Sequence, residues 1–156
     1  MSDTSHSVFY TSSVPFDPER IGAVAVYCSD GRFGDQFDDL LHNALKFPRY
    51  DRLAVPGGAA CLANHFATYR EEHGVVEQLK FLVDVHGLKH VVLIAHEGCA
   101  FYTHRLQVSP LQLESQQQED MRKAMRRVHS ISHRLIVHAF FARKQFDGTI
   151  QFELWE

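Results

Sequence analysis

Short apolar runs alternate with helical patterns along the first two thirds of the chain. The nearly continuous runs Ile21–Tyr27 and His90–Ala95 are typical of strands that a parallel sheet buries on both faces. A shorter run, Arg52–Val55, is closed by the turn residues Pro56-Gly57-Gly58 and predicts another strand. Strands that alternate with helices imply right-handed crossovers, so this pattern predicts a mainly parallel sheet.

Apolar residues spaced three and four apart predict helices between these strands. The first helix is predicted to begin at Asp35, the next stripe covers Val75–Val85, and a third helix is predicted for Leu111–Ile131. A further helical stretch is expected directly after the paired glycines. In the second stripe, Phe81 and Val85 widen the apolar face, so this helix is expected to need cover on two sides.

The last two apolar runs, Leu135–Phe141 and Thr149–Leu154, are joined across Asp147-Gly148, which favours a hairpin. The predicted fold class is therefore α/β, with a mainly parallel sheet of four strands, an antiparallel C-terminal edge strand and helices on both faces. The chain has 156 residues and is 45% hydrophobic, which suits one domain. We expect a short N-terminal arm at 1–20 and a single domain at 21–156.

Charge and composition narrow the range of partners. The formal net charge is -3, so there is no large positive field to attract nucleic acid or anionic lipid. No segment is long enough to cross a membrane, and the polar stretch Met1–Ser13 does not look like a secretory signal. We therefore expect a cytoplasmic protein, in which the three cysteines remain reduced and free for metal binding or catalysis.

Two cysteine-containing turns follow the two clearest strands. Cys28-Ser29-Asp30-Gly31-Arg32 comes after the first strand, and His96-Glu97-Gly98-Cys99 comes after the strand at His90–Ala95. Ligands bind beyond the carboxyl ends of parallel strands, and neighbouring strands lie only about 5 Å apart. If these strands are neighbours, Cys28, His96 and Cys99 can converge on one ion. Two thiolates and an imidazole suit Zn²⁺ and leave a fourth tetrahedral position open.

The cysteines allow two other interpretations. A free cysteine is often only a small buried hydrophobic residue, and this is the interpretation for Cys61, which has no spaced partner. A phosphatase nucleophile at Cys28 is disfavoured because such loops place an arginine six positions after the cysteine, whereas Arg32 is four positions away. Near the motifs, His65, His104 and Glu97 are candidate proton shuttles but are interpreted as ordinary surface or supporting groups.

Together the two turns resemble the paired zinc-binding motifs of the β-carbonic anhydrases, and the likeness runs from about Gly22 to Leu154. The resemblance implies that Cys28, His96 and Cys99 bind Zn²⁺ and that Asp30 and Arg32 form the catalytic dyad. In that role, Asp30 accepts a hydrogen bond from the metal-bound hydroxide and Arg32 clamps its carboxylate. Two alternatives for Asp30 stay open: a local ion pair that braces the turn, or a fourth metal ligand in a closed state.

The implied function is reversible hydration of carbon dioxide to bicarbonate by a homodimer or larger homo-oligomer. The sequence departs from the family pattern at Pro56, and at Ala100, where the family usually has glycine. Phe101 and Tyr102 follow, so a bulkier pocket wall is expected and the choice of substrate stays open. Alternatives are a zinc hydrolase of carbonyl sulfide or carbon disulfide on the same fold, and a non-catalytic zinc-binding regulatory module.

Overall fold

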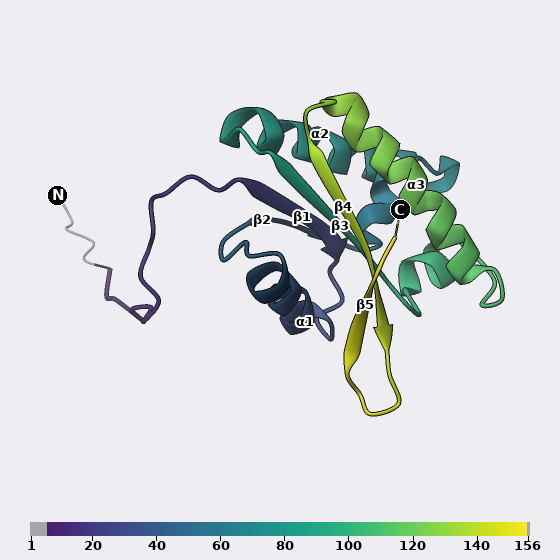
Figure 1. Ribbon diagram of the computed structural model, residues 1–156, viewed down its shortest axis with the longest axis horizontal. Coiled ribbons are helices and arrows are strands. Elements are labelled where there is room, and N and C mark those ends of the chain that lie inside the picture. Colours follow the sequence, from purple (N-terminus) through teal and green to yellow (C-terminus); the bar gives the residue numbers. More distant parts are fainter. Residues whose placement is uncertain (1–5, 156) are drawn as a thin grey trace.

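A five-stranded sheet forms the centre of the computed structural model, which describes residues 6–155 (Figure 1). The strands are β1 (Ala23–Cys28), β2 (Asp51–Val55), β3 (His90–His96), β4 (Ile136–Lys144) and β5 (Ile150–Leu154). Their order in the sheet is β2-β1-β3-β4-β5. All neighbours pair in parallel except β4 and β5, which are antiparallel. This arrangement confirms the predicted fold class.

Helices cover both faces of the sheet. The helix α1 (Gly34–Asp39) lies on one face, and α2 (Tyr69–His86) and α3 (Leu113–Ile131) lie on the other (Figure 1). Alternate residues of β1 enter the two resulting cores: Val24 and Val26 pack in the core under α2 and α3, and Ala25 packs in the core under α1. Because a strand buried on both faces must be apolar at every position, β1 appears in the sequence as a continuous apolar run.

Two local predictions differ from the structure. The first helix begins at Gly34 with Phe33 at its N-cap, so Asp35 lies in the first turn and does not cap the helix. The stretch after the paired glycines forms two short 3₁₀ turns, Gly58–Leu62 and Phe66–Thr68, in place of a longer helix. Between these turns Asn64 adopts a φ of 70°, and this left-handed backbone cannot continue a right-handed helix.

The turn after β2 packs directly under the end of β1. Gly58 has a φ of 51°, and a Cβ atom built on it would lie 2.4 Å from the backbone nitrogen of Cys28. The backbone N–H of Ser29 donates to the carbonyl of Val55 at 3.1 Å, which joins the two strand ends beyond the ladder. Only glycine allows such a close approach of two backbones, so Gly58 helps to fix the position of Cys28.

Several large apolar side chains stay exposed in the single chain. On α2, Phe81 is 59% and Val85 is 56% exposed, so the single chain covers only one side of the broad apolar face, and cover on a second side stays a prediction. Residues 6–20 contain neither helix nor strand, and Arg49 holds their last part by donating to the carbonyls of Asp17 and Glu19 at 3.1 and 3.0 Å.

Among residues 6–155, no helix combines the length and the apolar character that spanning a bilayer requires.

Candidate metal centre

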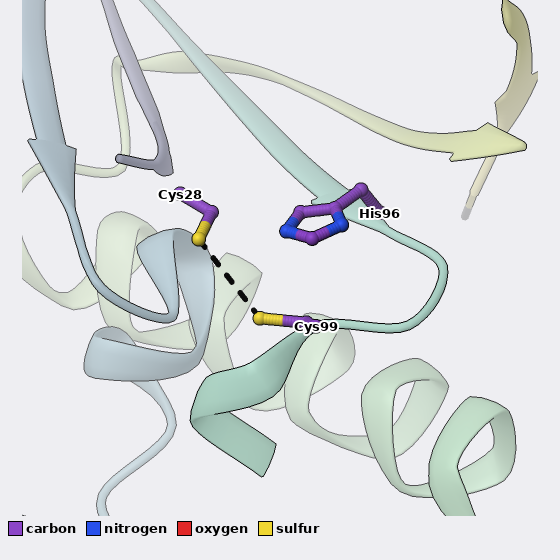
Figure 2. A group of neighbouring side chains, drawn as sticks. All are labelled: Cys28, His96 and Cys99. Atoms are coloured by element: carbon purple, nitrogen blue, oxygen red, sulfur yellow. Dashed lines mark hydrogen bonds between the residues drawn. The ribbon is translucent and has the colours of Figure 1, made fainter. Parts of the chain in front are cut away.

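Cys28, His96 and Cys99 lie together at the carboxyl ends of β1 and β3 (Figure 2). Their ligand atoms all lie within 4.8 Å of one another, and the two sulfurs are 4.0 Å apart. Two thiolates bound at about 2.3 Å to a tetrahedral zinc ion would lie about 3.8 Å apart. The three side chains are thus spaced almost as a zinc ion requires, although they come from turns 68 residues apart in the chain.

His96 presents a free ring nitrogen to the two sulfurs. Its Nδ1–H donates to the backbone carbonyl of Glu97 at 2.8 Å, which leaves the lone pair on Nε2. The side chain is 1% exposed, and within residues 6–155 Nε2 has no hydrogen-bond partner. A buried acceptor without a partner costs about 1–3 kcal/mol. Because the ring points toward the sulfurs (Figure 2), a metal ion among the three side chains would satisfy this nitrogen.

The two thiols suit a divalent cation. With one proton between the sulfurs, the hydrogen bond from Cys99 lowers the pKa of Cys28 to about 4, and the same bond raises the pKa of Cys99. The pair therefore loses one proton easily but keeps the other, because two thiolates this close would repel each other. A bound cation removes that repulsion and allows both sulfurs to ionise. The donor set, two thiolates and one neutral imidazole, fits Zn²⁺.

Hydrogen bonds to neighbouring elements hold the turn that contains His96 and Cys99. Gly98 adopts a φ of 64°, which lets the chain turn tightly between the two candidate ligands. The Gln117 side chain on α3 donates from Nε2 to the His96 carbonyl at 2.8 Å. On the other side, the Glu97 N–H donates to the carbonyl of Ala142 at 3.1 Å, and its carboxylate accepts from the backbone N–H of Lys144. The turn is fixed by both α3 and β4.

Asp30 and Arg32 form a forked ion pair in the turn after Cys28. Arg32 donates from Nε to Oδ1 at 3.0 Å and from Nη2 to Oδ2 at 2.7 Å, and its backbone N–H donates to Oδ1 at 3.1 Å. These hydrogen bonds lower the pKa of Asp30 to about 2, so the carboxylate is ionised at neutral pH. The side chain of Arg32 is 80% exposed. The geometry suits a catalytic dyad and a bracing ion pair alike, so the role of Asp30 stays a prediction.

One hollow adjoins the candidate ligands, and a second lies beside the turns that contain them. One is enclosed, measures about 10 Å³ and is lined by all three of them together with Tyr102 and Gln117. The other measures about 460 Å³ and opens outward beside Arg32 and Gly98. The smaller hollow has room for about one water molecule, so within one chain the space beside the three ligands is too small for a larger substrate.

The other candidate residues from the sequence lie in different surroundings. Cys61 is buried, donates from Sγ to the Pro56 carbonyl at 3.4 Å, and has its pKa raised to about 12 by burial. His104 is exposed. His65 is largely buried and lies between Glu72 and Asp120 at 2.8 and 2.7 Å. The sequence did not point to that contact or to Gln117, because these residues are polar and far apart in the chain.

An α/β sheet with a Cys₂His cluster at its carboxyl edge defines a class of candidate metalloprotein, and comparison with known proteins specifies the family. The family model described as "Putative carbonic anhydrase" matches residues 19–151. Because this match covers most of the sequence, the chain belongs to that carbonic anhydrase family.

Individual relatives are distant. The chain is 24% identical over 94 residues to an uncharacterized protein of Rickettsia conorii, a match that spans 60% of this chain and 49%, about half, of the relative. A solved β-carbonic anhydrase, isoform I of Trichomonas vaginalis, aligns with a TM-score of 0.56 and 12% identity over 95% of this chain and 88% of that one. A tetrameric β-carbonic anhydrase from Sordaria macrospora aligns with a TM-score of 0.44 and 17% identity over 86% and 81%. The Trichomonas alignment shows that the fold is that of the β-carbonic anhydrases.

Proposed function

We propose that this protein is a zinc enzyme that reversibly hydrates carbon dioxide to bicarbonate. One observation carries the proposal: in a chain of the carbonic anhydrase family, Cys28, His96 and Cys99 surround a point toward which the unpartnered Nε2 of His96 is directed. Three protein ligands leave one tetrahedral position free, which is the arrangement of catalytic rather than structural zinc sites. This favours an enzyme over a non-catalytic zinc module.

Asp30 and Arg32, in the turn after Cys28, supply the remaining groups for carbon dioxide hydration. Bound Zn²⁺ supplies a Lewis acid that makes hydroxide available near neutral pH. Asp30 is ionised and can accept a hydrogen bond from the attacking oxygen. This hydrogen bond fixes the direction of the remaining lone pairs on that oxygen. Arg32 holds both carboxylate oxygens and so prevents rotation of Asp30. Positioning of the nucleophile is the joint contribution of this pair.

Stopped-flow measurement of carbon dioxide hydration by zinc-loaded protein tests the proposal, and Asp30→Asn tests the dyad. Since the neutral amide cannot replace a charged acceptor, we expect kcat/KM to fall by about 10²- to 10⁴-fold while zinc content stays that of the parent. Asp147→Asn is the matched control, because Asp147 also accepts hydrogen bonds within its own turn, from Thr149, but lies in the β4–β5 hairpin.

A parent rate no higher than buffer would reject the enzymatic proposal. Sulfide release from carbonyl sulfide or carbon disulfide by the same preparation, without carbon dioxide hydration, would instead support the hydrolase alternative. If Asp30→Asn keeps the parent rate, the pair only braces the turn.

The proposal includes assembly into a homo-oligomer in the cytoplasm. The exposed Phe81 and Val85 on α2 give a second copy an apolar surface to cover. No disulfide links the three cysteines, which suits a reducing compartment. We expect light scattering after size exclusion to give at least twice the chain mass of 17.9 kDa.

Phe81→Glu should shift the protein toward the monomer, because it places a charge in the covered surface. Phe146→Glu is the control, since Phe146 is a fully exposed phenylalanine in the hairpin turn. A monomeric parent contradicts this prediction, as does a Phe81→Glu variant that keeps the parent's mass.

A further inference from the structure

His65 joins two buried carboxylates that come from different helices. Its Nδ1 lies 2.8 Å from Glu72 Oε1 on α2, and its Nε2 lies 2.7 Å from Asp120 Oδ2 on α3. The two carboxylate residues are 2% and 1% exposed. Each ring nitrogen faces a carboxylate oxygen, and only an imidazolium donates to both at once, so the contacts favour the doubly protonated ring of His65. Although burial lowers its pKa, the bonds to Asp120 and Glu72 raise it to about 9.

The remaining carboxylate positions are also occupied. Glu72 Oε2 accepts from the hydroxyl of Thr68 at 2.6 Å and from the backbone N–H of His65 at 3.0 Å. Asp120 Oδ1 accepts from the Gln116 amide at 3.0 Å. Two buried carboxylates would be costly without a cation, so the imidazolium makes this cluster of charges possible. We name His65, Glu72 and Asp120 the imidazolium clamp.

The clamp reaches the candidate metal centre through Tyr102. The Tyr102 hydroxyl donates to Asp120 Oδ2 at 2.8 Å, the same oxygen that faces His65. The Tyr102 N–H donates to the carbonyl of Cys99 at 3.1 Å, and its side chain lines the enclosed hollow. One turn earlier on α3, Gln117 holds the carbonyl of His96. Side chains of α3 thus form hydrogen bonds with both ends of the segment from His96 to Tyr102.

We propose that His65 is a positioning residue of the metal centre: by bonding to Asp120 and orienting it, His65 fixes Tyr102 and through it the Cys99 turn. This inference rests on the proposed function in one respect, that Cys28, His96 and Cys99 bind a metal. Groups that orient metal ligands typically change metal affinity by about 10- to 100-fold when they are removed. A cluster that only stabilises the fold would change the free energy of unfolding and leave the affinity of the folded protein unchanged.

Two variants separate these roles. His65→Gln removes the cation, and Tyr102→Phe removes only the link between Asp120 and the Cys99 turn. Tyr50→Phe is the matched control, because Tyr50 is also a buried tyrosine whose hydroxyl donates to an aspartate, Asp38, in the core under α1. Zn²⁺ affinity is measured by chelator competition, and ligand geometry by the visible absorption of the Co²⁺-substituted protein.

We expect the Kd for Zn²⁺ to rise about 10- to 100-fold in both His65→Gln and Tyr102→Phe, with a changed Co²⁺ spectrum. Tyr50→Phe should lose stability but keep the parent's affinity and spectrum. Parent-like affinity in Tyr102→Phe overturns the positioning role, whether or not His65→Gln folds. A parent that binds no zinc overturns the proposed function and this inference with it, so the two failures are distinguishable.

Discussion

Cys28→Ser is expected to abolish zinc binding and carbon dioxide hydration together. Serine offers a neutral hydroxyl in place of a thiolate, so the site would keep only His96 and Cys99 and lose one of its two negative charges. The hydrogen bond from Cys99 lowers the pKa of Cys28, so the cysteine pair can supply a thiolate before a metal arrives. Metal analysis should give about one zinc per parent chain and almost none for the variant, and stopped-flow traces should fall to the buffer rate.

The third cysteine provides the control for this experiment. Cys61 is buried with a pKa raised to about 12, so it stays a neutral thiol at neutral pH. Cys61→Ser replaces the thiol by a more polar hydroxyl that can still donate to the Pro56 carbonyl, so it should cost no more than about 1–3 kcal/mol of stability, and zinc content and turnover should stay those of the parent. Zinc retained by Cys28→Ser, or lost from Cys61→Ser, would show that the metal centre has been assigned to the wrong residues.

The parts of the fold that the sequence predicted are those where burial dictates residue type. Both faces of β1 and β3 are covered, so the pattern of apolar residues located the two strands to within two residues. Their carboxyl ends then located the turns of Cys28 and His96. Whether the strands are neighbours could not be predicted from either run, because pairing depends on the whole sheet. The register Val26↔Leu93 in the structure supplies that adjacency.

The imidazolium clamp could not be predicted because its residues follow no periodic pattern. Glu72 lies in the first turn of α2, where an acidic residue usually faces solvent near the positive end of the helix. Asp120 follows three glutamines and Glu119 on α3, so the sequence gives no sign that it is buried. Their common partner, His65, is 55 residues from Asp120, so only tertiary packing brings the three together.

The start of α2 could not be predicted either, because it also depends on buried polar residues. The apolar stripe predicted a helix over Val75–Val85, but α2 begins at Tyr69. A hydrophobic stripe reports only the buried face, and the first turn of α2 buries polar groups such as Glu72. The departure from the family pattern at Ala100 lies at the start of a short helical turn. Ala100 precedes the short π-helical turn Phe101–Arg105, and Phe101 packs over Gly57, where a Cβ atom would lie 2.5 Å from its ring.

Among substitutions of the glycines by alanine, Gly58→Ala is expected to destabilise the protein most. The φ of 51° alone costs a non-glycine residue about 1–2 kcal/mol. The new Cβ would also lie 2.4 Å from the backbone of both Tyr27 and Cys28, and a backbone within the sheet cannot move aside as a flexible side chain can. We expect urea unfolding to show a loss of more than about 4 kcal/mol or no folded protein at all.

Gly31→Ala is the matched control, since it lies in the turn that follows Cys28 and a Cβ there meets no atom within 4 Å. It should stay within about 0.5 kcal/mol of the parent. Because the backbone that Gly58 contacts is that of Cys28, any Gly58→Ala protein that does fold must displace this ligand and should bind zinc more weakly than the parent. Parent-like stability and zinc affinity in Gly58→Ala would mean that the turn after β2 does not hold the end of β1 in place.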